Sequence, residues 1–214
     1  MVRKSFFAFG LLMIVNQAKS QELNWAYSYL QTSTQQETSY RISSNHNDLF
    51  VIAGKGIKNI NLDVVSGTTG YESGESFIAV YNKDAEIQWK VDGVDQFSHT
   101  KYGYNVFMDE DDNVYAMGRY SGSLDFDPGP NNVTINAGPT GAMYVQKFDQ
   151  TGKFLWVKVV PLFGIPEQAD MKSNGNLVVG GNNFGNTPIT LSNSDSIKIE
   201  PGLFVLEFAP NGDL

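Results

Sequence analysis

Residues 144–156 read Tyr-Val-Gln-Lys-Phe-Asp-Gln-Thr-Gly-Lys-Phe-Leu-Trp, an alternating segment followed by a polar turn and a second apolar segment. Two-residue alternation of apolar and polar side chains is typical of a half-buried β-strand. The short polar connection, which includes Gly152, is a hairpin signal. This stretch therefore predicts two antiparallel strands joined near Gly152, the second of which carries Trp156.

The same pattern recurs along the chain. Trp25, Trp89 and Trp156 lie 64 and 67 residues apart. Each unit also contains alternating and apolar segments that predict strands, at 48–54, 77–81, 112–118, 144–148, 175–180 and 204–208. No stretch after residue 20 has the period of an amphipathic helix. Repeated units of about four strands are typical of a β-propeller. We therefore expect an all-β fold, a partial β-propeller of about three four-stranded blades, with units near 25–88, 89–155 and 156–214.

The tryptophans are best explained as packing residues between blades. One four-stranded blade is too thin to bury both of its faces, so neighbouring blades must stack and share apolar side chains. A buried tryptophan removes roughly 150 to 250 Å² from water. Trp25, Trp89 and Trp156 occupy equivalent positions in their units, which favours this structural role. The functional alternative is a platform on which sugar rings stack.

The first twenty residues have the organisation of a secretory signal peptide. Arg3 and Lys4 give a positive start, residues 6–15 form an apolar run, and Ala18-Lys19-Ser20 is a small-x-small cleavage site. A helix that crosses a bilayer needs roughly twenty apolar residues, so a membrane anchor is the weaker interpretation. We expect a signal peptide over 1–20, cleavage after Ser20, and secretion or display at the cell surface of the propeller repeats in 21–214.

Composition excludes several classes of function. The chain of 214 residues has no cysteine and two histidines, so disulfides, thiolate catalysis, cysteine zinc sites and multi-histidine metal centres are excluded. Its net charge is −8, and becomes −11 once Arg3, Lys4 and Lys19 are removed with the signal peptide. Nucleic-acid binding needs a clustered basic face, which is absent from the sequence. We therefore expect neither a nucleic-acid partner nor a membrane span.

One acidic run is a candidate calcium site. Asp109, Asp111 and Asn113 place oxygen ligands at alternate positions, as a calcium loop does. The EF-hand pattern fails, because Val114 stands where glycine is required and Tyr120 where glutamate is required. A solvated hairpin turn is the better interpretation, so we expect no cofactor, and calcium is the one exception that these residues leave open.

No motif predicts a catalytic centre. The sequence has no Gly-x-Ser-x-Gly, no phosphate-binding Gly-x-x-x-x-Gly-Lys and no His-Glu-x-x-His. Asp125 and Asp127 stand beside Pro128-Gly129, where carboxylates commonly cap turns. If the chain is an enzyme, Asp109, Asp111 and Asp125 are the candidate acids, because paired carboxylates can hydrolyse glycosides.

The repeat resembles a known family. Leu124-Asp125-Phe126-Asp127-Pro128-Gly129, followed by the strand, turn and tryptophan of 141–156, is similar to the secreted β-propeller repeats (SBBP-like) of Bacteroidetes exported proteins. The similarity is good in the second unit and looser in the others, and Val65-Ser66-Gly67 stands where the family has Asp-Pro-Gly. The resemblance implies an extracellular scaffold without shared catalytic residues, and function must still be argued from a site.

Three functions follow as hypotheses. The first is a secreted, non-catalytic scaffold or binding module whose partner is a protein or a glycan. The second is an extracellular enzyme, or a fragment of one, that acts on polysaccharide or peptide. The third is a redox propeller of the quinoprotein type, suggested by Gly-Lys-Phe-Leu-Trp at 152–156. Three blades are fewer than a closed propeller has, so we expect either further blades beyond Leu214 or self-association.

Secretion is tested by the N-terminus of the exported protein. Expression of the full chain in a bacterium with a general secretion pathway should give an extracytoplasmic product that begins at Gln21, read by mass spectrometry of the intact protein. Replacing Arg3 and Lys4 by glutamate should block export, because the positive start is lost. A product that keeps Met1 would contradict the signal peptide.

Overall fold

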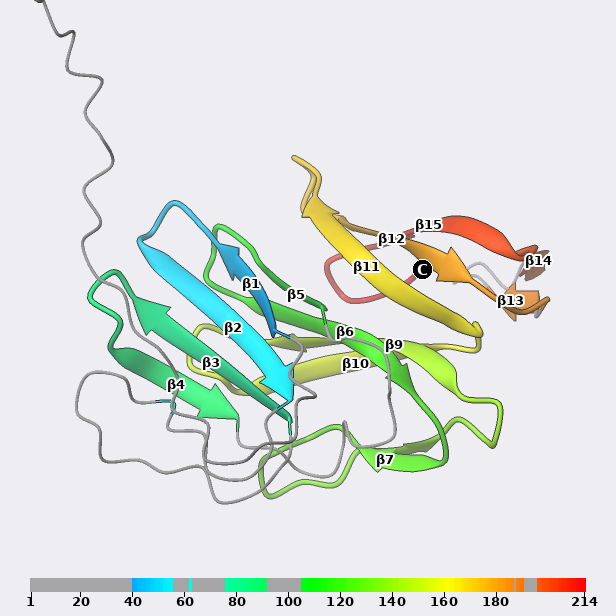
Figure 1. Cartoon of the computed structure of the whole chain (residues 1–214), viewed down its shortest axis with the longest axis horizontal. Coiled ribbons are helices and arrows are strands. Elements are labelled where there is room, and N and C mark those ends of the chain that lie inside the picture. Colours follow the sequence, from blue (N-terminus) through cyan, green and yellow to red (C-terminus); the bar gives the residue numbers. More distant parts are fainter. Residues whose placement is uncertain (1–39, 56–61, 63–75, 92–104, 187, 191–195) are drawn as a thin grey trace, which may run out of the picture.

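The computed structural model describes residues 40–55, 62, 76–91, 105–186, 188–190 and 196–214. Every regular element in these residues is a β-strand, which confirms the all-β prediction (Figure 1). In this part of the chain, no helix is long and apolar enough to cross a membrane. The proposed signal peptide and Trp25 lie outside the described residues.

The described strands form three larger antiparallel sheets (Figure 1). Sheet 1 has the order β1-β2-β3-β4 and consists of β1 (Tyr40–Ser44), β2 (Leu49–Lys55), β3 (Ser76–Asn82) and β4 (Ile87–Val91). Sheet 2 has the order β10-β9-β6-β5 and consists of β5 (Asn105–Met108), β6 (Val114–Tyr120), β9 (Ala142–Phe148) and β10 (Phe154–Val160). Sheet 3 has the order β11-β12-β15 and consists of β11 (Gly164–Met171), β12 (Leu177–Asn183) and β15 (Gly202–Phe208).

Two small hairpins are inserted into this plan at matching points. The first lies between β6 and β9, and the second between β12 and β15. They are formed by β7 (Ser123–Asp125) with β8 (Thr134–Asn136), and by β13 (Pro188–Thr190) with β14 (Ser196–Lys198). Sheets 2 and 3 therefore connect their second and third long strands in the same way.

The tight hairpins share one backbone geometry. In the loop after β9, the N–H of Asp149 donates to the carbonyl of Lys153 and the N–H of Gly152 donates back to Asp149, both at 2.9 Å. The fourth residue of such a loop has positive φ, which is typical of a type I turn closed by a bulge. Positive φ recurs at that loop position in all three sheets, at Asp48, Ala85, Asp112, Gly152, Gly175 and Gly212.

Sheet 2 is buried on both faces. Its Ala142, Tyr144 and Phe148 pack in one core with Val51 and Val80 of sheet 1. Its opposite face contributes a second core, which it shares with sheet 3; the contributing residues from the two sheets include Tyr115, Met143, Val145, Leu177, Val179, Phe204 and Leu206. Successive residues of β6 and β9 face opposite sides of the sheet, and both sides are buried. This explains why these strands are almost continuously apolar.

The first strands of the three sheets lie side by side. β5 contacts β1 on one side and β11 on the other (Figure 1). The N–H of Met108 donates to Ser43 Oγ at 3.1 Å, and the side-chain amide of Asn105 donates to the carbonyl of Glu167. These polar contacts fix the position of β5 between its two neighbours.

Each described tryptophan lies on the last strand of one sheet and contacts a hairpin glycine of the next. A Cβ built on Gly152 would lie 2.7 Å from Cε3 of Trp89, and one built on Gly212 would lie 3.0 Å from Cε3 of Trp156. The indole N–H of Trp156 also donates to the carbonyl of Pro210 at 3.2 Å. Trp89 and Trp156 thus join consecutive sheets at equivalent points.

The contact between Trp89 and Gly152 can be tested by adding one methyl group. Gly152→Ala places a β-carbon in an occupied space and at a positive φ of 82°, so we expect a loss of about 2 to 4 kcal/mol in the free energy of unfolding. Gly138→Ala is the matched control, because φ there is 68° and nothing lies within 4 Å of the new atom. The control should cost only about 1 kcal/mol. Equal losses in urea denaturation would show that the indole contact contributes nothing.

Candidate functional site

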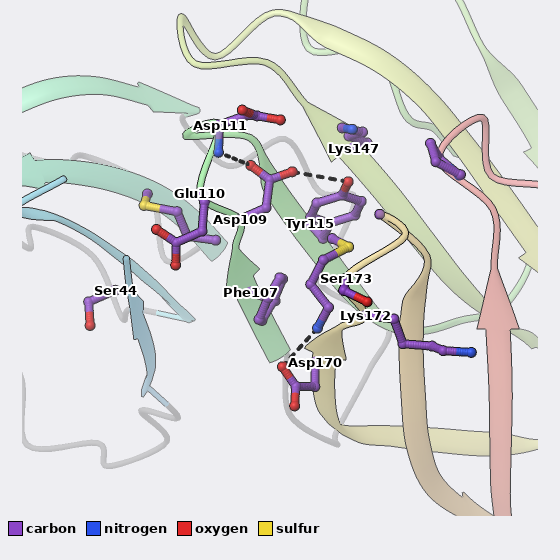
Figure 2. Close-up of a pocket in the computed structure, with 14 residues that line it drawn as sticks. Ser44, Phe107, Asp109, Glu110, Asp111, Tyr115, Lys147, Asp170, Lys172 and Ser173 are labelled. Atoms are coloured by element: carbon purple, nitrogen blue, oxygen red, sulfur yellow. Dashed lines mark hydrogen bonds between the residues drawn. The ribbon is translucent and has the colours of Figure 1, made fainter. Parts of the chain in front are cut away.

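A cavity lies where sheets 2 and 3 meet at the end of their first hairpins (Figure 2). It has a volume of about 670 Å³. The loop 109–113 after β5 forms one wall and the loop 172–176 after β11 forms the other. Phe107 and Tyr115 supply aromatic surface, with ring centroids 6.1 Å apart. The cavity therefore combines an aromatic lining with two polar loops.

Asp109 is used to build the first of these loops. Its Oδ1 accepts the backbone N–H groups of Asp111 at 3.0 Å and Asn113 at 2.8 Å. Its Oδ2 accepts the hydroxyl of Tyr115 at 3.2 Å (Figure 2). The same oxygen accepts the side-chain amide of Asn113 at 3.0 Å. Asp109 is 9% exposed, so these donors replace the water that its carboxylate loses. The carboxylate is thus a turn cap of the kind predicted for an acidic hairpin.

The three calcium candidates are engaged in different ways. Asn113 turns its amide nitrogen toward Asp109, and the carboxylate of Asp111 is exposed at the surface. Among the residues that the structure describes, no group of three or more histidine, aspartate or glutamate side chains is arranged to hold a metal ion. The oxygens of Asp109 are also occupied by N–H and O–H donors.

Tyr115 is held as a neutral hydroxyl. Burial, and after it the negative charge of Asp109, raise the pKa of Tyr115 far above the usual range of a phenol. The phenol therefore remains a hydrogen-bond donor to Asp109 at every physiological pH. The ammonium of Lys147 lies 4.8 Å from the centre of the same ring, where the negative face of the ring attracts a cation.

The corresponding junction between sheets 1 and 2 is closed by hydrogen bonds. Asn45 and Asn47 both donate from their side chains to Oδ1 of Asp112, at 2.6 and 2.9 Å. His46 Nδ1 lies 2.7 Å from a carboxylate oxygen of Glu110. His46 is thus an exposed partner of Glu110. The loop 45–49 is fastened to the loop 109–113 by these contacts, whereas a cavity occupies the space between 109–113 and 172–176.

Charge at the cavity is predominantly negative. Four carboxylates line it, those of Asp109, Glu110, Asp111 and Asp170. The two lysines that line it have partners: Lys147 lies over Tyr115, and Lys172 donates to Glu207 at 3.0 Å. Hydrogen bonds from Asn176 and Lys172 keep the pKa of Glu207 below its usual range.

The third candidate acid is placed elsewhere. Asp125 lies at the end of β7, where its Oδ1 accepts the backbone N–H groups of Asp127 at 3.2 Å and Val133 at 2.8 Å. Oδ1 of Asp127 in turn accepts the N–H of Gly129 at 2.8 Å. Both carboxylates therefore cap the loop 126–133. Asp109 and Asp111 line the cavity described above, and Asp125 does not.

Sequence reasoning identified Asp109 and Asp111 but missed the rest of the cavity. Phe107, Lys147 and Asp170 come from three different strands, so their proximity depends on how the sheets pack. The sequence signal that could have located the cavity is a comparison of the equivalent first hairpins of the three sheets. Residues 45–47 read Asn-His-Asn, whereas 172–174 read Lys-Ser-Asn, so the polar groups that close one junction are partly replaced at the other.

The capping role of Asp109 gives a stability prediction. Asp109→Ala leaves two backbone N–H groups and the Tyr115 hydroxyl without their acceptor, so we expect a loss of about 2 kcal/mol in the free energy of unfolding. Asp111→Ala removes an equal charge from the exposed neighbour and should change stability by less than about 0.5 kcal/mol. Thermal denaturation of both variants measures the difference, and equal melting temperatures would contradict the capping role.

Comparison with known proteins does not assign a chemistry to this cavity. No protein-family model matches the chain, and no curated protein matches it either. The side chains that line the cavity, together with their charges and partners, are therefore the basis on which a function can be proposed.

Proposed function

We propose that this chain is a secreted, non-catalytic β-propeller module that binds a ligand at the cavity between loops 109–113 and 172–176. Three features support the propeller arrangement. Sheets 1 and 2 are four-stranded meanders, sheet 2 packs face to face against both neighbours, and β1, β5 and β11 lie side by side. Repeated four-stranded sheets packed around a common centre are the plan of a propeller. Secretion rests on the signal-like sequence of residues 1–20.

The single observation that supports a binding role is a difference between two junctions, that of sheets 1 and 2 and that of sheets 2 and 3. Side-chain hydrogen bonds close the junction of sheets 1 and 2, while a cavity of about 670 Å³ with aromatic and charged walls remains at the junction of sheets 2 and 3. A concave site of this size, lined by aromatic rings and a few polar groups, is typical of ligand pockets.

The charges of the cavity favour a ligand with a positive group. Glu110, Asp111 and Asp170 are exposed carboxylates on its rim. Four carboxylates line the cavity against two lysines, and Lys172 is already paired with Glu207, so the excess charge of the lining is negative. A basic side chain on an extracellular protein satisfies this chemistry, because its cation meets the acids while its aliphatic stem covers the aromatic lining.

Binding is tested with short peptides of differing charge. The chain from residue 21 should bind lysine- or arginine-containing peptides more tightly than acidic or neutral ones, and the affinity should fall as salt rises. Asp170→Asn should weaken binding about fivefold, which corresponds to about 1 kcal/mol for one charge near a surface. Asp84→Asn, an equal charge change on an exposed loop of sheet 1, should leave the affinity unchanged.

Two outcomes would favour the other functions. If the cavity binds a neutral glycan and Asp170→Asn does not change the affinity, the ligand is a sugar and not a basic side chain. Hydrolysis of a polysaccharide or peptide that disappears on Asp125→Asn would make the chain an enzyme. Titration with a quinone cofactor, read by absorbance, tests the redox alternative beside them.

A further inference from the structure

A second cavity lies between sheets 1 and 2 and shares no lining residue with the cavity described above. It has a volume of about 510 Å³. Its walls are residues 90–91 at the end of β4, residues 127–131 of the loop after β7, and residues 152–154 at the hairpin that leads into β10. A volume of this size lies within the range of small-molecule sites, about 300 to 1,000 Å³.

The charge of this second cavity is opposite to that of the first. Lys90 and Lys153 contribute two ammonium groups to the lining, and Asp127 is the one carboxylate among the described residues that line it. Lys153 is exposed and Lys90 is half-buried. The chain as a whole has a net charge of −8, so this pair of lysines creates a local positive potential on an acidic protein. Such a potential favours an anion.

The carboxylate of Asp127 is already used to build the loop. Its Oδ1 accepts the backbone N–H of Gly129 at 2.8 Å, and its Oδ2 accepts the side-chain amide of Asn131 at 3.1 Å. A Cβ built on Gly129 would lie 2.9 Å from Oδ1 of Asp127, so this close approach requires glycine. Both oxygens thus have donors within the loop, which offset part of the negative charge that a bound anion would meet.

The loop that forms this wall is ordered without a ligand. Pro128 and Pro130 stand on either side of Gly129, and each proline ring fixes its own φ. The N–H of Phe126 donates to the carbonyl of Val133 at 3.2 Å, and the ring of Phe126 is fully buried. These contacts hold the two ends of the loop together. A wall that is rigid in the free protein loses little conformational entropy when a ligand binds.

We propose that this second cavity binds an acidic sugar, whose carboxylate is held by the ammonium groups of Lys90 and Lys153. Val91, Phe154 and the two prolines of the loop provide apolar surface for the C–H face of the sugar ring. The side-chain amide of Asn131 lines the same space and is a partner for a hydroxyl group. A sugar is favoured over an acidic side chain of a protein, because the cavity is larger than one such side chain fills.

Calorimetric titration of the full chain with a trimer of galacturonic acid tests this assignment. Saturable binding is expected, with an affinity that falls as salt rises. Lys153→Met and Lys90→Met keep an unbranched stem but remove the charge, so each should weaken binding about fivefold. Lys198→Met is the matched control, because it makes the same charge change on β14, outside the lining. It should leave the affinity unchanged. No saturable binding at millimolar sugar, or an equal loss in the control, would overturn the proposal.

Two further ligands test the chemistry of the site. A neutral trimer of galactose should bind about tenfold more weakly than the acidic trimer, because it lacks the carboxylates. A glutamate tripeptide should also bind more weakly, because it has the charge but no sugar ring. Equal binding of the neutral trimer would contradict the role of the lysines. Equal binding of the peptide would make the ligand an acidic protein segment and overturn the sugar assignment.

Nuclear magnetic resonance locates the bound sugar. The backbone amide signals of Gly129, Asn131 and Lys153 should shift during titration with the acidic trimer, and that of Asp170 in the first cavity should not. Asp170→Asn, which tests the basic ligand of the first cavity, should leave the affinity for the acidic sugar unchanged. The two binding proposals can therefore fail separately. Shifts at Asp170 without shifts at Lys153 would contradict binding in the second cavity.

Discussion

The burial of sheet 2 on both faces is the constraint on which the rest of the structure depends. β6 and β9 bury nearly every residue, half of them toward sheet 1 and half toward sheet 3. A sheet with two apolar faces is stable only when both are covered, because each exposed face would leave several large side chains in water. The positions of sheets 1 and 3, and therefore the contact of β5 with β1 and β11, follow from this requirement.

The hairpins at the ends of the strands contribute to this packing between sheets. A left-handed residue in the loop lets the chain reverse with the right twist, and at Gly152 and Gly212 the missing side chain also leaves room for a tryptophan. Side-chain caps complete the loops, as Asp109 does with Asp111 and Asn113. Local turn chemistry and contact between sheets thus act on the same few residues, which explains why the sequence repeats there most visibly.

Differences between equivalent loops create the surface features on which the proposed binding role rests. Asn45 and Asn47 close one junction by bonding to Asp112, while the Lys-Ser-Asn loop at 172–174 stands across a cavity from Glu110 and Asp111. A shared fold with unequal loops provides both a scaffold and places at which partners can be recognised.

The strands with strong alternation, and the turns between them, could be predicted from the amino-acid sequence alone. The segments at 77–81, 144–148 and 204–208 lie within β3, β9 and β15, because a two-residue period and a short polar turn are local properties of the chain. β11 was not predicted, since Gly-Ile-Pro-Glu-Gln-Ala-Asp-Met has no such period. That Phe107, Lys147 and Asp170 share one cavity, and that Asp125 lies apart from it, became visible only in the folded chain. Those distances depend on how separate sheets pack, and packing joins residues that sequence spacing keeps far apart.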